Sequence, residues 1–384
     1  MTKSVFRQGK SGDTSQPIIG GESVNVARYD QLAHPTYDKL TEKQLSFFWR
    51  PEEVDVSKDR IDFNERLTPA EKHLFVQNLK YQVLLDSVQG RGPSEAFGAI
   101  ASISEFENWV KTWEFSETIH SRSYTHIIRN LFNDPSKIFD EIESDTEITK
   151  RATDVSEYYD QAIEKSKLYS LFGDQPIIVG GKKIQTSLRE VKELAYLCMQ
   201  SVNALEAIRF YVSFACSFSF AERKLMEGNS KIIKLIARDE NLHLSSTQYT
   251  INAWNKGKDD PEMKEIAEKY APQVKKIFLD AVEQEKAWAD HLFSKGSVIG
   301  LNAQILKDYV EYIADNRMAA IGIDSGFNVK GNPLPWMNSY LSSDNVQVAP
   351  QESEISSYLV NQVDSTVSED DLKEFEKEFS EFSL

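Results

Sequence analysis

The sequence predicts an all-α protein: a bundle of long helices with a small inserted β-hairpin and a flexible C-terminal tail. Between about residue 28 and about residue 325, apolar residues recur with the period of a helix, and strand signals are rare. The 384 residues, of which 40% are hydrophobic and 11% aromatic, are enough to fill a large core. We expect three parts: an N-terminal segment over 1–28, a helical domain over 29–341 and a tail over 342–384.

Boundary signals place the helices in order along the chain. The first begins at Thr68-Pro69-Ala70-Glu71, a capping box with proline at the first helical position, and it ends before Gly90. A hairpin is predicted where two β-rich runs flank Gly-Gly, in the sequence IIVGGKKI over 177–184. The helical period continues over 101–132, 150–172, 187–224, 229–255, 260–295 and 302–321, and it is lost after 332–336.

Composition and charge exclude several classes of protein. The 60 acidic and 44 basic residues give a formal charge of −16, the wrong sign for binding nucleic acid or an anionic membrane. The two cysteines, Cys198 and Cys216, lie in apolar helical pattern, which excludes a disulfide framework and indicates a reducing compartment. The apolar stretch 195–220 holds Glu206 and Arg209 near its centre, so we expect a buried helix rather than a membrane span. The first residues contain no apolar signal core, so we expect a cytoplasmic protein.

A repeated motif carries the candidate chemistry. Two of the six histidines close the same pattern, Glu-x-x-His, whose acid and imidazole share one face of a helix. A further carboxylate precedes the two copies by 31 and 34 residues, each time on an apolar helix face. Two helical hairpins would bring all six groups together: Asp86, Glu117, His120, Glu206, Glu240 and His243.

The expected burial of the four carboxylates predicts a two-metal site. Unpaired carboxylates on apolar helix faces are costly unless they are protonated or bound to cations. Four carboxylates carry −4, which two divalent ions neutralise, and oxygen-rich ligation with one imidazole per metal favours iron or manganese over zinc. A four-helix bundle with such a ligand set is the arrangement of di-iron carboxylate proteins. The alternative is that the acids pair with Arg122, Arg209 or Arg238 and that the histidines are ordinary core residues.

Aromatic and apolar residues lie at helical spacing from these motifs. Tyr124 follows His120 by four positions and Glu117 by seven, so its phenol would lie beside the metals, where it can lose an electron and a proton. Ordinary core packing is the alternative. A dry pocket beside the metals is predicted from three residues at helical spacing from Glu206 and Glu240, for which packing is again the alternative: Phe210, Phe214 and Ile236.

At these residues the chain closely resembles the small (beta) subunit of class Ia aerobic ribonucleotide reductase. The similarity runs from about residue 26 to about residue 364 and includes QLSFFWRPEE over 44–53, LLDSVQG over 84–90, ETIHSRSYTHIIR over 117–129, NALEAIRFY over 203–211 and IARDENLH over 236–243. The resemblance implies a ferritin-like bundle in which the six motif residues bind two irons per chain, with manganese less favoured. It further implies that dioxygen and a reductant assemble this centre and leave a stable radical on Tyr124.

The resemblance also implies partners. The radical equivalent passes to a large (alpha) subunit that reduces ribonucleoside diphosphates, and the small subunit forms a homodimer. The transfer route maps onto a tryptophan hydrogen-bonded to an aspartate beside His120, and onto two residues of the tail: Trp49, Asp239, Glu352 and Tyr358. The segment 351–384 has ten acidic residues and two lysines, a net −8 that is half of the total charge. Its end fits the family loosely, so the identity of the large subunit stays open.

Two other functions remain open from the residues themselves. A di-iron oxygenase, desaturase or ferroxidase of the same fold needs the ligands but neither Tyr124 nor a tail tyrosine. A metal-free helical interaction protein would use the acidic tail to bind a basic partner and would bind no iron. The long motif matches favour the radical-generating subunit.

Overall fold

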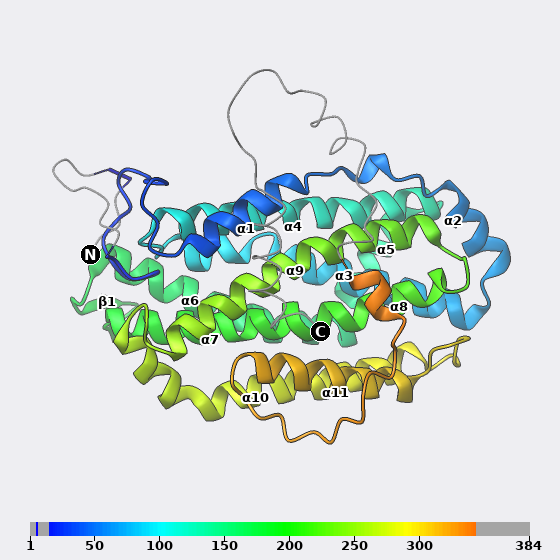
Figure 1. Ribbon diagram of the computed structural model, residues 1–384. Coiled ribbons are helices and arrows are strands. Elements are labelled where there is room, and N and C mark those ends of the chain that lie inside the picture. The colour runs from blue at the N-terminus through cyan, green and yellow to red at the C-terminus, as the bar shows by residue number, and fades with distance from the viewer. Residues whose placement is uncertain (1–4, 7–14, 343–384) are drawn as a thin grey trace, which may run out of the picture.

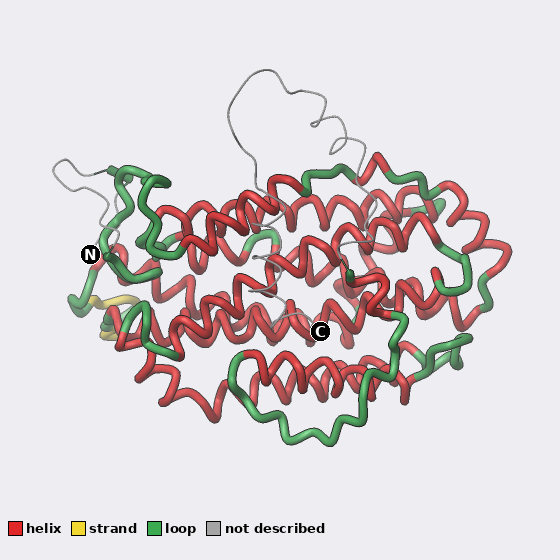
Figure 2. Tube along the Cα trace, viewed as in Figure 1, coloured by secondary structure: helices red, strands yellow, loops and turns green. Residues whose placement is uncertain are grey.

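Helices form nearly all of the regular structure in the computed structural model, which describes residues 5, 6 and 15–342 (Figure 1). Figure 2 shows this helical content in red, with one small yellow hairpin at the end of the bundle near the N-terminus. The helices are α1 (Pro35–Ser46), α2 (Ser57–Ile61), α3 (Pro69–Gln89), α4 (Ser104–Leu131), α5 (Pro135–Ser144), α6 (Thr146–Phe172), α7 (Leu188–Ala204), α8 (Phe210–Ala221), α9 (Glu227–Asn255), α10 (Pro261–Leu292), α11 (Ala303–Ala320) and α12 (Met337–Leu341). Four shorter helical turns join them, namely η1 (Pro51–Glu53), η2 (Asp62–Arg66), η3 (Ser94–Gly98) and η4 (Leu205–Arg209).

The bundle is layered (Figure 1). Helices α1 and α4 pack together on one side, α10 and α11 pack together on the other, and α7 and α9 lie between them. Helix α3 packs against α4, α6 and α8. The all-α class and the bundle are therefore as predicted from the helical period. The predicted tail, from residue 343 onward, lies outside the described residues.

Local chemistry explains where the elements begin and end. Thr68 accepts the backbone N–H of Glu71, and the Glu71 carboxylate accepts the N–H of Thr68, so the predicted capping box starts α3. The hairpin is confirmed as β1 (Ile177–Val179) and β2 (Lys182–Ile184), paired antiparallel. Gly180 and Gly181 both have positive φ, 56° and 78°, the conformation that a tight two-residue turn requires.

Some boundaries differ from the predicted ones. The helix expected from 101 begins at Ser104, because Ala101 forms a β-bridge with Ile19 and the N–H of Ser102 donates to the Ile18 carbonyl. The helix expected from 150 begins at Thr146, after its own N-cap. Helices α1, α2, α5 and α12 were not predicted individually; they are short, and a short helix shows too few turns of apolar period to be recognised.

The stretch expected as one helix over 187–224 is a continuous run of α7, η4 and α8, in which η4 is a π-helix. By length and composition Leu188–Ala221 is apolar enough to cross a membrane, yet 94% of its most apolar window is buried inside the bundle. This run is the core helix of the fold, as the two charges near its centre predicted. Its interior position brings Glu206 into the middle of the molecule.

Candidate metal centre

Four elements deliver the predicted ligands to one place. Helices α3 and α4 carry the first half of the motif, and η4 and α9 carry the second half. All six side chains are fully buried, with 0% of their surface exposed: Asp86, Glu117, His120, Glu206, Glu240 and His243. The two helical hairpins therefore meet as the spacing predicted.

The six residues form two overlapping groups of four. In each group the ligand atoms lie within 4.8 Å of one another. Glu117 and Glu240 belong to both groups; Asp86 and His120 complete the first, and Glu206 and His243 complete the second. Each group thus offers three carboxylates and one imidazole, and a pair of metal ions would share Glu117 and Glu240. Oxygen-rich sets with a single nitrogen suit iron or manganese.

The buried oxygen atoms support this assignment independently. Both carboxylate oxygens of Asp86, Oε2 of Glu206 and Oε1 of Glu240 make no hydrogen bond of normal geometry, although Oε1 of Glu240 lies 3.1 Å from Nδ1 of His120. Buried polar atoms in native proteins are almost always satisfied, so such a cluster of incompletely satisfied oxygens needs an explanation. Two divalent cations held by these residues would supply the missing partners and balance the four negative charges. The residues present therefore fit a two-metal centre.

The pKa shifts show what happens to this cluster without cations. Burial and the charge of Glu117 raise the pKa of Asp86 well above its ordinary value. Burial and Glu240 do the same to the pKa of Glu206. Burial opposes the charged form of His243, but Glu117 and Glu240 outweigh it and raise the pKa of His243 to about 9. Asp86, Glu206 and His243 therefore favour their protonated forms in the metal-free cluster, and a bound metal ion would have to displace those protons.

The three arginines that offered an alternative to metal have partners outside the cluster. Arg122 lies 3.7 Å from the Glu52 carboxylate. Arg209 lies 3.0 Å from Glu285. Arg238 donates to the Phe47 carbonyl at 2.9 Å and lies 3.7 Å from Asp239, the neighbour of a ligand rather than a ligand.

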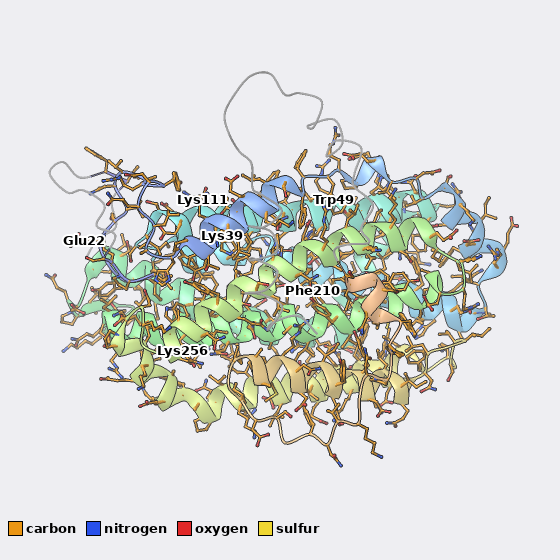
Figure 3. All side chains as sticks on the ribbon, viewed as in Figure 1. Glu22, Lys39, Trp49, Lys111, Phe210 and Lys256 are labelled. Atoms are coloured by element: carbon orange, nitrogen blue, oxygen red, sulfur yellow. The ribbon has the colours of Figure 1, made fainter. Side chains whose placement is uncertain are left out.

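Hydrogen bonds from outside the ligand set orient the first group. Nε2 of His120 lies 3.1 Å from Oδ2 of Asp239, and the indole Nε1–H of Trp49 donates to that same oxygen at 2.9 Å. The rings of Trp49 and His120 are 6.4 Å apart and nearly parallel. The structure therefore brings the predicted Trp49, Asp239 and His120 into one chain. Figure 3 places Trp49 on the α1 and α4 side of the bundle and Phe210 nearer its middle.

Four further contacts were not predicted from the sequence. Nε2 of His243 lies 2.8 Å from the Ser116 hydroxyl, and Trp113 donates to Glu117 at 2.8 Å. Gln89 donates to the Glu206 carboxylate, and the Tyr159 hydroxyl donates to Gln89 at 2.7 Å. Helical spacing from the motifs could have pointed to three of these residues, since Trp113 precedes Glu117 by four, Ser116 precedes His120 by four and Gln89 follows Asp86 by three. For Tyr159 the sequence gives no comparable signal.

Tyr124 is fully buried beside the centre. Burial, followed by the charge of the adjoining Asp86 carboxylate, raises the pKa of Tyr124 well above its ordinary value. The hydroxyl makes no hydrogen bond of normal geometry. The three residues expected to form a dry pocket are also fully buried, on α8 and α9: Phe210, Phe214 and Ile236. Glu352 and Tyr358 lie outside the described residues.

Comparisons with known proteins identify the family of this chain. The family "Ribonucleotide reductase, small chain" matches residues 27–333. The chain is 59% identical to ribonucleoside-diphosphate reductase subunit beta of Haemophilus influenzae and 58% identical to ribonucleoside-diphosphate reductase 1 subunit beta of Escherichia coli O157:H7, in both cases over 98% of this chain and all of the relative. The R2 subunit from Clostridium botulinum shares the fold, with a TM-score of 0.71 at 22% identity, over 89% of this chain and 99% of that one. The chain belongs to the ribonucleotide reductase small chain family.

Proposed function

We propose that this chain binds two irons at the six ligand residues, forms a stable radical on Tyr124, and passes the oxidising equivalent to the large (alpha) subunit of ribonucleoside-diphosphate reductase. The observation that carries the proposal is the position of the buried Tyr124 phenol beside Asp86, a member of a ligand set in which two carboxylates are shared. Two bound irons would supply the reduction of dioxygen, with electrons drawn from the irons, from the Tyr124 phenol and from an external reductant.

Iron is the metal proposed, with manganese the less favoured alternative. Both groups of donors are rich in oxygen and hold one imidazole each, and either metal accepts such a set. The assignment to iron rests on the resemblance to the class Ia small subunit. The ligand roles of the six residues are part of the same proposal.

The surroundings of Tyr124 suit a radical that has to persist. Its raised pKa keeps the phenol protonated at rest, so oxidation has to release a proton together with the electron. The side chain has 0% of its surface exposed, which keeps water and reductants away from the oxidised ring. Phe210, Phe214 and Ile236, equally buried, are proposed to supply the dry walls of this pocket.

The route out of the centre is proposed to run through Trp49. The hydrogen-bonded chain from His120 through Asp239 to Trp49 links a metal ligand to an oxidisable indole. From there the route is proposed to continue to Tyr358, with Glu352 assisting its proton movement, and the acidic tail is proposed to dock on the large subunit. The family name "small chain" and the relatives' name "subunit beta" support pairing with a large subunit, and a homodimer is proposed from the resemblance.

The proposal is tested by loading the full-length protein with Fe²⁺ under anaerobic conditions and then admitting air. We expect two irons per chain, a sharp tyrosyl absorption and a matching paramagnetic signal. A di-iron oxygenase or ferroxidase of the same fold would bind iron and consume dioxygen with no organic radical. That result would overturn the radical assignment, and absence of bound iron would overturn the metal assignment.

A further inference from the structure

The π-helix η4 holds two charged residues three positions apart, Glu206 and Arg209, inside the core helix. In an α-helix, residues three apart share one face. Here the N–H of Phe210 donates to the carbonyl of Leu205, five residues back, which marks a widened turn. The wider turn sends Glu206 into the metal cluster and Arg209 toward α10. The geometry of η4 therefore decides whether Glu206 reaches the metals.

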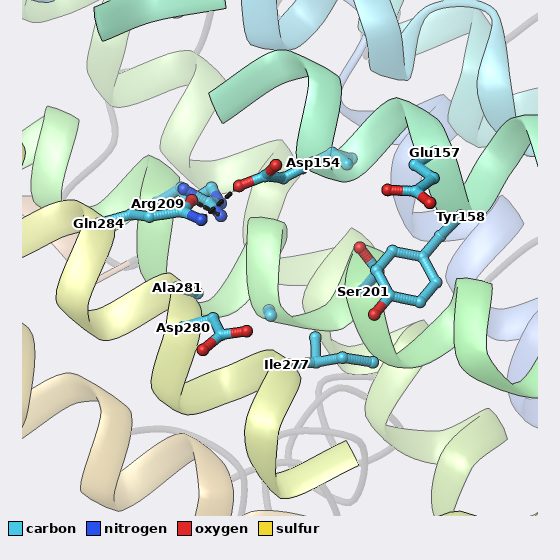
Figure 4. A pocket seen from close by; sticks show the side chains of 11 residues that line it. Asp154, Glu157, Tyr158, Ser201, Arg209, Ile277, Asp280, Ala281 and Gln284 are labelled. Carbon is cyan, nitrogen blue, oxygen red and sulfur yellow. Dashed lines mark hydrogen bonds between the residues drawn. The ribbon is translucent and has the colours of Figure 1, made fainter. Parts of the chain in front are cut away.

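Arg209 is tied to α10 by a two-pronged contact. Its Nη1 donates to Oε1 of Glu285 at 3.0 Å, and its Nη2 donates to Oε1 of Gln284 at 2.6 Å. Gln284 in turn donates to the Asp154 carboxylate of α6, and Figure 4 shows these three side chains meeting at the edge of a cavity of about 190 Å³ between α6, α7 and α10. Arg209 is 4% exposed and Glu285 is fully buried, so both charges depend mainly on protein partners for compensation.

Glu285 also reaches a second ligand-bearing helix. Its Oε1 accepts the Tyr81 hydroxyl at 2.6 Å and lies 3.9 Å from Nε of Arg151. Tyr81 stands on α3, five residues before the ligand Asp86. One carboxylate of α10 thus contacts both α3 and η4 from outside the metal cluster. Arg151 keeps other partners, the Glu147 carboxylate and the Gln284 carbonyl.

We propose that Arg209 is a positioning residue, whose two hydrogen bonds to α10 hold the widened turn of η4 in the shape that brings Glu206 to the metal centre. A π-turn is rare and needs support from its surroundings, and relaxation to an α-turn rotates Glu206 relative to its neighbours. The inference rests on the proposed metal centre. Because Glu206 belongs to only one of the two ligand groups, loss of the clamp weakens one metal site and spares the other.

The competing explanation is that the Arg209–Glu285 ion pair only stabilises the fold. Replacing both partners with apolar residues distinguishes this explanation from the positioning role. Removing one partner of a buried pair leaves an unpaired charge, whereas replacing both partners with apolar residues of similar volume is often neutral. The triple variant Tyr81→Phe/Arg209→Met/Glu285→Met removes the ion pair and the hydrogen bonds of Arg209 to α10. It also removes the Tyr81 hydroxyl, which would otherwise lose Glu285 as its acceptor. Tyr81→Phe alone is the matched control. Arg209→Lys keeps the charge but offers a single point contact instead of a fork.

The experiment is an anaerobic titration of the full-length proteins with Mn²⁺, followed by electron paramagnetic resonance and by thermal unfolding. We expect wild type and Tyr81→Phe to bind two ions as a magnetically coupled pair. The triple variant and Arg209→Lys should bind the second ion about 10- to 100-fold more weakly, so that the signal of an isolated Mn²⁺ persists.

A coupled pair of wild-type affinity in the folded triple variant would overturn the positioning role. If the triple variant does not fold, the signal of isolated Mn²⁺ in Arg209→Lys tests the positioning role instead. A coupled pair of wild-type affinity in that variant would overturn the role. Failure of wild type to bind any Mn²⁺ would instead count against the metal centre itself, so the two failures are distinguishable.

Discussion

The indole Nε1–H of Trp49 donates a 2.9 Å hydrogen bond to Oδ2 of Asp239, although 190 residues separate them. The same oxygen lies 3.1 Å from Nε2 of His120. Both Trp49 and Asp239 are buried, with about 1% of their surface exposed or less. Within the part of the chain that the structure describes, these contacts connect His120, a candidate metal ligand, to Trp49, a side chain proposed for radical transfer.

We expect Trp49→Phe to stop reductase turnover while leaving the metals and the Tyr124 radical in place. Phenylalanine keeps an aromatic ring but cannot donate to Asp239, and it is much harder to oxidise. Turnover with the large subunit should fall to background, as measured by deoxyribonucleotide formation. Trp254→Phe is the matched control, because Trp254 is fully buried on α9 and its indole nitrogen has no hydrogen-bond partner. Comparable activities of the two variants would remove Trp49 from the route.

Substitution of a shared ligand should differ from substitution of an unshared one. Glu240 belongs to both groups of donors, and Asp86 to only one. We expect Glu240→Ala to weaken both metal sites and abolish radical formation, whereas Asp86→Ala should leave one ion bound per chain. Metal analysis of the two purified variants distinguishes these outcomes. Two irons and a normal radical in Glu240→Ala would exclude Glu240 from the centre.

Tyr124→Phe should have little effect on stability and none on metal stoichiometry. The Tyr124 hydroxyl makes no hydrogen bond of normal geometry and only a looser contact with the Asp86 carboxylate, so its removal should change the free energy of unfolding by less than about 1 kcal/mol. Tyr81→Phe provides the contrast, since its hydroxyl donates to Glu285 at 2.6 Å and its loss should cost about 1–3 kcal/mol. Denaturant titration measures both values. Equal losses would mean that the Tyr124 hydroxyl is bound as tightly by Asp86 as the Tyr81 hydroxyl is by Glu285.

The stability of the metal-free protein should fall with rising pH. A histidine in the unfolded chain has a pKa of about 6.5. Burial opposes protonation of His243, but Glu117 and Glu240 raise its folded pKa to about 9. The protonated imidazole therefore stabilises the fold fully below about pH 6.5, and this contribution, on the order of a few kcal/mol, is lost as the pH rises toward about 9. Denaturant titrations in the presence of a chelator should show that the free energy of unfolding declines over this pH range. Added Mn²⁺ should reduce this pH dependence. A free energy of unfolding that does not change with pH in the metal-free protein would contradict the raised pKa of His243.

The tail should serve two separable tasks, although it lies outside the described residues. Phe375, Phe379 and Phe382 are spaced by four and three among acidic residues, which would place them on one helical stripe against a groove of the large subunit. Deletion of 368–384 should weaken subunit binding strongly and leave the Tyr124 radical intact. Tyr358→Phe should bind normally and fail to turn over. If Tyr358→Phe turns over normally, or if the truncated chain binds unchanged, the corresponding half of this prediction is wrong.

The meeting of the six candidate ligands in one cluster could be predicted because helices make spacing in sequence equivalent to position on a face. The two Glu-x-x-His motifs and the preceding carboxylates needed only a long apolar period around them to be placed together. The same logic covers Trp113 and Gln89, which lie on the same helices as ligands. It cannot reach Tyr159, whose contact with Gln89 depends on how α6 packs on α3.

The π-turn of η4 also lay beyond sequence reasoning. A regular α-helical period through 187–224 would place Glu206 and Arg209 on one face, and Arg209 then appears as a candidate partner for the acids. The widened turn separates them, and Arg209 pairs with Glu285 on α10 instead. The separation of Glu206 from Arg209 depends on tertiary packing, which the helical period does not encode.

The most direct test of the radical on Tyr124 is electron paramagnetic resonance of the iron-loaded, aerated protein prepared with ring-deuterated tyrosine. We predict an organic radical signal that narrows on deuteration, because the unpaired electron resides on a tyrosine ring, and that is absent from Tyr124→Phe with its two irons retained. A radical signal of unchanged width, or one that persists in Tyr124→Phe, would contradict the assignment.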